Sequence, residues 1–329
     1  MTRLISTLLL TLTLVAAKTQ PVPLGLCLEN YTYPYPVKYI TLHLQHEELK
    51  MAYMDVRPGQ PNGHTILLLH GKNFCGAYWG PTAKALSAKG YRVIIPDQVG
   101  FGKSSKPEHL QYTFQLLAQN TKAVLDSAQV DKVIVLGHSM GGMVATRFTL
   151  MYPGIVEKFI LEDPIGLEDW KLKIPYQDVD ASYKNELKQT RVTLKKYMLD
   201  NYFHGVWRSD YDETLNILAG WTLNPGYDRI AWNSALTSDM IFTQPVCYEF
   251  GQIRVPSLLI IGQLDRTAPG KNRAPENVRP TLGDYPALGK LTQEKILNCQ
   301  LISLPGVGHI PHMEAFDTFI TSVLNFLVP

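Results

Sequence analysis

Residues 133–142 read VIVLGHSMGG, and this stretch decides the fold of the chain. It places Ser139 between Gly137 and Gly141, after a short apolar run and before a helix-forming run. In a strand-to-helix turn of the form Gly-x-Ser-x-Gly the serine backbone is strained, and larger side chains two positions away would collide. The hydroxyl is exposed where the following helix begins, and that N-terminus stabilises a developing oxyanion. We therefore predict that Ser139 is a nucleophile.

The rest of the chain alternates short apolar runs with helix-length segments. Such a rhythm predicts a parallel sheet covered by helices on both faces. Two earlier runs have the patterning of an antiparallel hairpin at the sheet edge. The fold class is therefore α/β, with a mostly parallel sheet of eight strands, predicted at Val37–Leu44, Leu49–Val56, Thr65–His70, Arg92–Asp97, Lys132–Gly137, Lys158–Asp163, Ser257–Gly262 and Gln300–Leu304.

The alternation stops between residues 164 and 256. This stretch is rich in Tyr, Trp, Lys and Asp, and it includes a polar helical segment near Tyr183–Phe203. It is too long for an ordinary connection, and long insertions tend to be functional. We predict a helical cap at 164–256, over the carboxyl ends of the strands, with the core formed by residues 18–163 and 257–329.

The first 17 residues have the pattern of a signal peptide. Arg3 provides the positive charge, Leu4–Val15 is largely apolar, and Val15-Ala16-Ala17 offers small residues for cleavage after Ala17. The alternative is an uncleaved anchor, but the apolar run is short for a bilayer and no basic cluster follows it. We expect export to the periplasm or the outside, without stable membrane insertion after cleavage.

Composition narrows the choice of partners. The formal net charge is +2, apolar residues make up 45% and charged residues 18%, which is a globular balance. No dense Lys/Arg block predicts nucleic-acid binding. The oligomeric state stays open. The cysteines match no zinc pattern and fit zero, one or two disulfides, with the pairing left open among Cys27, Cys75, Cys247 and Cys299.

Candidates for a base and an orienting acid follow the last two predicted strands. His309 lies in a Gly-rich loop that can carry its imidazole to Ser139, and His312 is the alternative, expected at the border of the cap. Asp265 follows the penultimate strand, and Asp163 competes with it from the strand before. We predict the triad Ser139, Asp265 and His309, in the chain order expected for this architecture.

The oxyanion needs rigid amide donors. One is the amide of Met140, which follows the nucleophile. The other is the amide of Lys72, in the loop HGKNF at residues 70–74, with Asn73 as a second candidate. His70 and His138 are interpreted as structural residues of these turns.

The stretch DQVGFGKSS at residues 97–105 has the glycine spacing of a phosphate-binding loop, but it lacks the order of a P-loop. We expect Asp97 to hold this loop by local hydrogen bonds. No cofactor and no metal site is predicted.

Five motifs in this order resemble the α/β-hydrolase superfamily, from about Val37 to the C-terminus. The branch that they are most similar to holds epoxide hydrolases, haloalkane dehalogenases, lactonases, carbon–carbon hydrolases and cofactor-free haloperoxidases. The motifs are His70-Gly71, Asp97-x-x-Gly100-x-Gly102, Gly137-x-Ser139-x-Gly141, Asp265 and Gly308-His309.

The chain departs from this branch at two positions. Epoxide hydrolases and dehalogenases resemble it but carry an aspartate nucleophile, whereas Ser139 favours attack on a carbonyl carbon. Asn73 stands where the oxyanion loop of the family has proline. The resemblance implies a serine hydrolase with a small-molecule ester or lactone as substrate. A carbon–carbon hydrolase and a non-catalytic ligand-binding protein are the alternatives.

Overall fold

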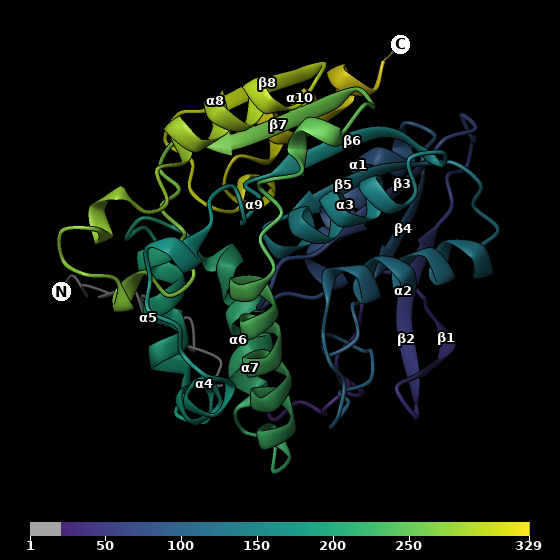
Figure 1. Cartoon of the computed structure of the whole chain (residues 1–329). Coiled ribbons are helices and arrows are strands. Elements are labelled where there is room, and N and C mark those ends of the chain that lie inside the picture. The colour runs from purple at the N-terminus through teal and green to yellow at the C-terminus, as the bar shows by residue number, and fades with distance from the viewer. Residues whose placement is uncertain (1–20, 329) are drawn as a thin grey trace, which may run out of the picture.

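The computed structural model describes residues 21–328, so the predicted signal peptide at residues 1–17 lies outside the described residues. A single eight-stranded sheet runs through the described part (Figure 1), in the order β1-β2-β4-β3-β5-β6-β7-β8. Its strands are β1 (Val37–Leu44), β2 (Glu47–Val56), β3 (Thr65–Leu69), β4 (Arg92–Pro96), β5 (Val133–His138), β6 (Val156–Glu162), β7 (Ser257–Gly262) and β8 (Cys299–Leu304).

The pairing of the strands confirms the predicted fold class. β1 and β2 form an antiparallel hairpin, with Val37 opposite Met54, and β2 also pairs antiparallel with β4. The remaining neighbours pair in parallel, from β4 across to β8. Parallel strands bring their carboxyl ends to one edge of the sheet, and the loops that follow them meet there.

Alternating side chains on the strands divide the core into two layers. Leu67 and Leu69 pack on one face with the helices at 114–127, 140–151 and 285–295, whereas Ile66 and Leu68 pack on the other with the helices at 80–88 and 316–327. This period of two is the geometry of an extended strand, and both faces are apolar because both are covered. The covering helices are α1 (Gly80–Ala88), α2 (Phe114–Ser127), α3 (Met140–Met151), α8 (Tyr285–Lys295) and α10 (Phe316–Leu327), and a short α9 (Pro311–Glu314) precedes α10.

Four helices lie between β6 and β7 in the chain, and Figure 1 shows them grouped beside the sheet. The polar segment that we placed near Tyr183–Phe203 is two helices rather than one. The second helix begins after Thr190, which caps its N-terminus. The Thr190 side chain accepts a hydrogen bond from the amide of Thr193, and the Thr193 hydroxyl accepts one from the amide of Thr190. The four are α4 (Val179–Glu186), α5 (Arg191–Asn201), α6 (Asp212–Trp221) and α7 (Tyr227–Thr243).

Residues 21–36 have no helix or strand, yet they are anchored against α6. Leu24 and Leu28 are buried, and the amide of Leu24 donates to the carbonyl of Gly220 at 3.1 Å. The indole of Trp221 donates to the carbonyl of Gly25 at 3.1 Å. This segment therefore joins the helices between β6 and β7 to the start of β1.

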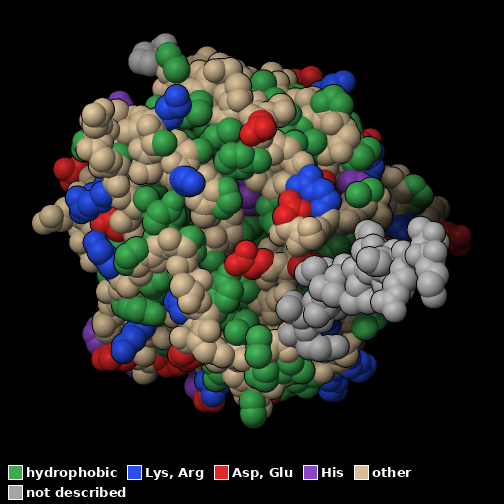
Figure 2. All heavy atoms as spheres, turned by 180° about the vertical axis from the view of Figure 1, so that it is seen from behind, with side chains coloured by type: hydrophobic (Ala, Val, Ile, Leu, Met, Phe, Trp, Pro, Cys, Tyr) green, Lys and Arg blue, Asp and Glu red, His purple; other side chains and the backbone are tan. Residues whose placement is uncertain are grey.

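The four cysteines are free thiols in the structure, so none of the disulfides left open by the sequence is formed. No helix among residues 21–328 has the length and hydrophobicity to cross a membrane. On the face in Figure 2, acidic and basic side chains are interspersed, in keeping with the small net charge of +2.

Candidate active site

Ser139 occupies the turn between β5 and α3, with φ 56° and ψ −121°. A non-glycine residue with positive φ is strained, and tight packing maintains the strain here. A Cβ atom on Gly137 would lie 2.2 Å from the Gly141 carbonyl oxygen, and one on Gly141 would lie 2.1 Å from that of Leu69. The two glycines are therefore required by the close approach of backbone on either side of Ser139.

The imidazole of His309 bridges Ser139 and Asp265. Its Nε2 lies 2.9 Å from Ser139 Oγ, and its Nδ1 lies 2.7 Å from Asp265 Oδ2. All three residues are buried. Because the carboxylate can only accept, Nδ1 carries the proton and Nε2 is free to accept the hydroxyl proton of Ser139. The structure thus brings together the three side chains that the sequence singled out.

The two competing residues lie nearby but make other contacts. Both carboxylate oxygens of Asp163 lie 3.0 Å from the amide of Gly262. Burial, followed by the charge of Asp265, raises the pKa of Asp163 well above its ordinary value. His312 Nδ1 lies 2.9 Å from a carboxylate oxygen of Glu162, and the His312 amide donates to the same oxygen.

The loop after β3 passes directly over Ser139. A Cβ atom on Gly71 would lie 2.9 Å from the Cβ of Ser139. In the described part of the chain, the amides of Lys72 and Met140 have no hydrogen-bond partner. Asn73 has φ 68°, and its side-chain amide donates to the hydroxyl of Tyr202 at 3.0 Å. The amides of Lys72 and Met140 are therefore available to an oxyanion.

A second hydrogen-bond chain lies behind these residues, and sequence reasoning missed it. The Gly71 amide donates to Tyr78 Oη at 3.1 Å, Tyr78 Oη lies 3.0 Å from His138 Nδ1, and His138 Nε2 lies 2.8 Å from the carbonyl oxygen of His309. A carbonyl can only accept, so Nε2 carries the proton and Tyr78 donates to Nδ1. Burial, then the neighbouring His309, lowers the pKa of His138 well below its ordinary value. This series of hydrogen bonds links the oxyanion loop to the backbone of His309.

Nothing in the sequence distinguished Tyr78 from the other 16 of the 17 tyrosines. His70, which precedes Gly71 in the chain, holds the turn that follows β4. Its Nε2 accepts a hydrogen bond from the amide of Gln98 at 3.0 Å. Asp97 accepts from the amides of Gly76 at 2.6 Å and Lys103 at 2.7 Å. These contacts are those of a scaffold, as we expected for both residues.

The end of α5 contacts the loop of His309. The carbonyl oxygen of Tyr202 accepts from the amide of His309 at 3.0 Å, and the two rings stack with centroids 5.0 Å apart. A Cβ atom on Gly308 would lie 2.2 Å from that carbonyl oxygen. A residue larger than glycine at position 308 would therefore collide with the backbone of the helical insertion.

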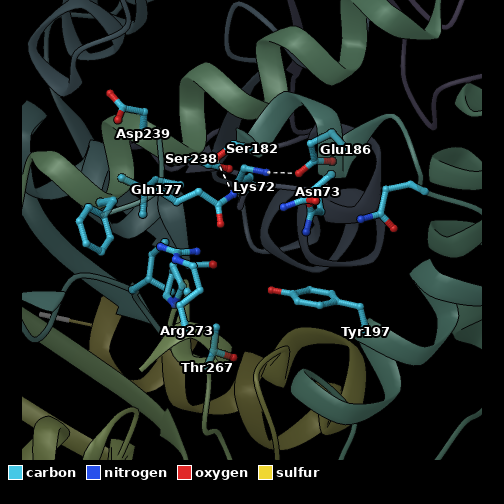
Figure 3. A pocket seen from close by; sticks show the side chains of 18 of the residues that line it. Lys72, Asn73, Gln177, Ser182, Glu186, Tyr197, Ser238, Asp239, Thr267 and Arg273 are labelled. Carbon is cyan, nitrogen blue, oxygen red and sulfur yellow. Dashed lines mark hydrogen bonds and ion pairs between the residues drawn. The ribbon is translucent and has the colours of Figure 1, made fainter. Parts of the chain in front are cut away.

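A cavity of about 240 Å³ reaches Ser139 between the helical insertion and the core. Lys72, Thr267 and Arg273 line it from the core, and Glu186 and Tyr197 line it from the helices (Figure 3). Charged and polar side chains thus form a large part of its lining, and we made no prediction about them from the sequence. Among the described residues no group of three or more His, Cys, Asp or Glu side chains could hold a metal ion.

Comparison with known proteins places this geometry in context. The family model described as alpha/beta hydrolase fold matches residues 64–316. The crystal structure of a probable hydrolytic enzyme from Pseudomonas aeruginosa PAO1 has a TM-score of 0.93 and 46% identity, covering 94% of this chain and 100% of that chain.

Two curated relatives are more distant. Lipase 1 of Psychrobacter immobilis is 26% identical over 272 residues, which are 82% of this chain and 77% of the relative. The 2-hydroxy-6-oxo-6-phenylhexa-2,4-dienoate hydrolase of Burkholderia cepacia is 27% identical over 278 residues, which are 80% of this chain and 88% of the relative.

Proposed function

Because this chain belongs to the alpha/beta hydrolase family and is a hydrolase by that membership, we propose that it cleaves carboxylic esters or lactones by nucleophilic catalysis at Ser139. The observation that carries the proposal is the continuous arrangement of Ser139 Oγ, His309 and Asp265, with contacts of 2.9 Å and 2.7 Å. The names of relatives such as the lipase support the reaction class.

In the proposed mechanism, Ser139 Oγ attacks the carbonyl carbon while His309 Nε2 takes the hydroxyl proton. The charge that develops on the carbonyl oxygen is stabilised by the amides of Met140 and Lys72. His309 then returns the proton to the leaving alcohol oxygen as the C–O bond breaks and an acyl-enzyme remains. A water molecule, deprotonated by His309, releases the acid and restores Ser139.

Asp265 acts on the imidazole rather than on the substrate. Its carboxylate fixes the ring so that Nε2 faces Ser139, and it stabilises the imidazolium formed in each half of the reaction. The Asp265 carboxylate also accepts from the amide of Thr267 at 2.7 Å, which holds it in place. This side chain is fully buried, so bulk water does not screen its charge from the imidazolium.

Hydrolysis of a carbon–carbon bond in a diketone-type substrate is the second candidate. It can use the same three side chains, and one relative is named as a hydrolase of a 2-hydroxy-6-oxo-dienoate. Cleavage of vinylogous diketones without ester turnover would favour it. A ligand-binding protein without catalysis is the third reading, and ligand-induced thermal stabilisation without turnover on a broad ester panel would support it.

Export is the further element of the proposal. The pattern of residues 1–17 supports it, although these residues lie outside the described part of the structure. A mature N-terminus at Lys18, found by mass spectrometry of the secreted protein, would agree with export. A chain that retains its first residues inside the cell would contradict it.

Replacement of Ser139 by alanine tests the activity. We expect Ser139→Ala to lower kcat for short p-nitrophenyl esters by about 10⁴- to 10⁶-fold, because the nucleophile is lost while the fold is retained. Melting temperature serves as the fold control, and a fluorophosphonate probe should label the wild type at Ser139 only. Undiminished turnover by the alanine variant would overturn the assignment.

A further inference from the structure

Three charged groups that line the cavity at Ser139 already have protein partners, and these are Lys72, Glu186 and Asp239. Lys72 Nζ donates to Ser234 Oγ at 2.7 Å and lies 3.9 Å from a carboxylate oxygen of Glu186. The charge of Lys72 is therefore already balanced in part by Glu186. Asp239 accepts from the hydroxyl of Tyr176 at 2.9 Å.

Arg273 lines the same cavity without a carboxylate partner. It ends the short 3-10 helix Lys271–Arg273, in the loop that follows β7 and Asp265. Among residues 21–328, the one hydrogen bond of its guanidinium is from Nε to the carbonyl oxygen of Pro175, at 3.4 Å. No described acceptor contacts Nη1 or Nη2, whose four N–H donors form the planar end of the guanidinium.

The surroundings of Arg273 hold its guanidinium in place. Its central carbon lies 5.8 Å from the ring centroid of Phe242, which gives the guanidinium an aromatic face to rest on. Figure 3 shows Arg273 among the side chains that line the pocket, together with Thr267. Burial lowers the pKa of Arg273 from its ordinary value. The Arg273 side chain is therefore partly desolvated and unneutralised.

A partly desolvated guanidinium with unfilled donors favours a planar anion that can accept two hydrogen bonds. A carboxylate has that shape, and arginine binds it in a bidentate way. We propose that Arg273 binds a carboxylate of the substrate, so that the enzyme acts on small esters or lactones that carry a second, free carboxylate. This inference rests on the proposed function, since Ser139 lies in the same cavity.

A matched pair of substrates tests the charge at constant size. Monoethyl glutarate carries the free carboxylate, and ethyl 4-carbamoylbutanoate carries a neutral amide of the same shape. Ethanol release gives kcat and KM for each. We expect Arg273→Gln to lower kcat/KM for monoethyl glutarate about 30-fold, mainly through KM, because a charge-assisted hydrogen bond is lost. The same variant should change kcat/KM for the amide by less than about twofold.

Arg254→Gln is the matched control, because it also removes one positive charge. Arg254 is exposed and lies outside the cavity. It should leave both substrates unaffected. Equal losses for the two esters in Arg273→Gln, or no loss for either, would overturn the proposal. A loss for the anionic ester in Arg254→Gln as well would also overturn it, because net charge would then explain the preference.

Binding measured without turnover separates this inference from the proposed function. Glutarate should raise the melting temperature of the wild type and of Arg254→Gln but not of Arg273→Gln, and glutaramide should leave all three unchanged. If the wild type hydrolyses neither these two esters nor the p-nitrophenyl esters, the proposed function fails and this binding result alone decides the role of Arg273. An equal shift by glutarate in all three proteins would contradict the role of Arg273.

Discussion

Asp163 and Asp265 show how neighbouring carboxylates acquire different roles from their contacts. They follow adjacent strands, β6 and β7, and both are buried. Asp265 contacts the imidazole of His309, whereas the carboxylate of Asp163 accepts, among residues 21–328, only from the amide of Gly262. The raised pKa of Asp163 favours its neutral form, so two buried charges are not held side by side.

Asparagine at each position should separate the two roles. We expect Asp265→Asn to lower kcat about 10³- to 10⁴-fold, because an amide cannot hold the imidazole in the required tautomer. Asp163→Asn should cost less than about tenfold, because Asp163 does not contact His309. Steady-state kinetics on one ester measures both variants. A larger loss in Asp163→Asn than in Asp265→Asn would reverse the assignment.

At the scale of elements, ion pairs as well as backbone hydrogen bonds connect the strands β1, β2 and β4 at the antiparallel edge of the sheet. Asp55 on β2 lies 2.9 Å from Lys38 on β1 and 2.8 Å from Arg92 on β4. Burial by itself would raise the pKa of Asp55, but its hydrogen bonds with Arg92 and Lys38 lower it from 3.8 to about 2. A carboxylate whose pKa is lowered in the folded state stabilises the fold wherever it is ionised.

The stabilisation by Asp55 should therefore depend on pH. It is fully present above pH 3.8, the ordinary pKa, and it is lost as the pH falls toward 2. We expect Asp55→Asn to lower the free energy of unfolding by about 1 to 2 kcal/mol at pH 7, since solvent around Lys38 screens part of the interaction. Urea denaturation should show this difference shrinking between about pH 4 and pH 2. A difference that is constant over that range would contradict the assignment.

At the scale of the whole molecule, the helical insertion is part of the site rather than a separate cover. Tyr202 at the end of α5 holds the backbone of His309 and also contacts Asn73 of the oxyanion loop. Residues 21–36 fasten α6 from another side through Gly25 and Trp221. Movement of the insertion would therefore be transmitted to His309.

Gly308→Ala tests this coupling. An added methyl group would lie 2.2 Å from the Tyr202 carbonyl oxygen, so the end of α5 and the loop of His309 must separate. We expect kcat to fall about 10- to 100-fold, because misplacement by about 1 Å is costly to catalysis. Gly306→Ala is the control in the same loop, with open space around its Cβ position but positive φ, and its kcat should exceed that of Gly308→Ala. Equal kcat in both variants would argue against the coupling.

Local chemistry determined much of the fold and part of the candidate site. The strand bounds were predicted to within one or two residues, because near-continuous apolar runs are characteristic of strands buried on both faces. The turn at Ser139 was readable because its glycine spacing is a local pattern: Gly137 is required by the backbone of Gly141, four residues later. The requirement for glycine at 141 comes from the backbone of Leu69 on β3. The division of the polar segment at Thr190 was missed, because a threonine cap makes only a weak signal in a polar stretch.

The sequence by itself determined the sheet, its helical insertion and the short list of residues around Ser139, because each of these depends on neighbours in the chain. Only the tertiary structure decided that Asp265 rather than Asp163 contacts His309, that Tyr78 joins the oxyanion loop to His138, and that Arg273 lines the cavity with no carboxylate of residues 21–328 paired to it. These contacts join residues from separate loops at the carboxyl edge of a parallel sheet, where the paths of those loops, and not their order in the chain, fix which side chains meet.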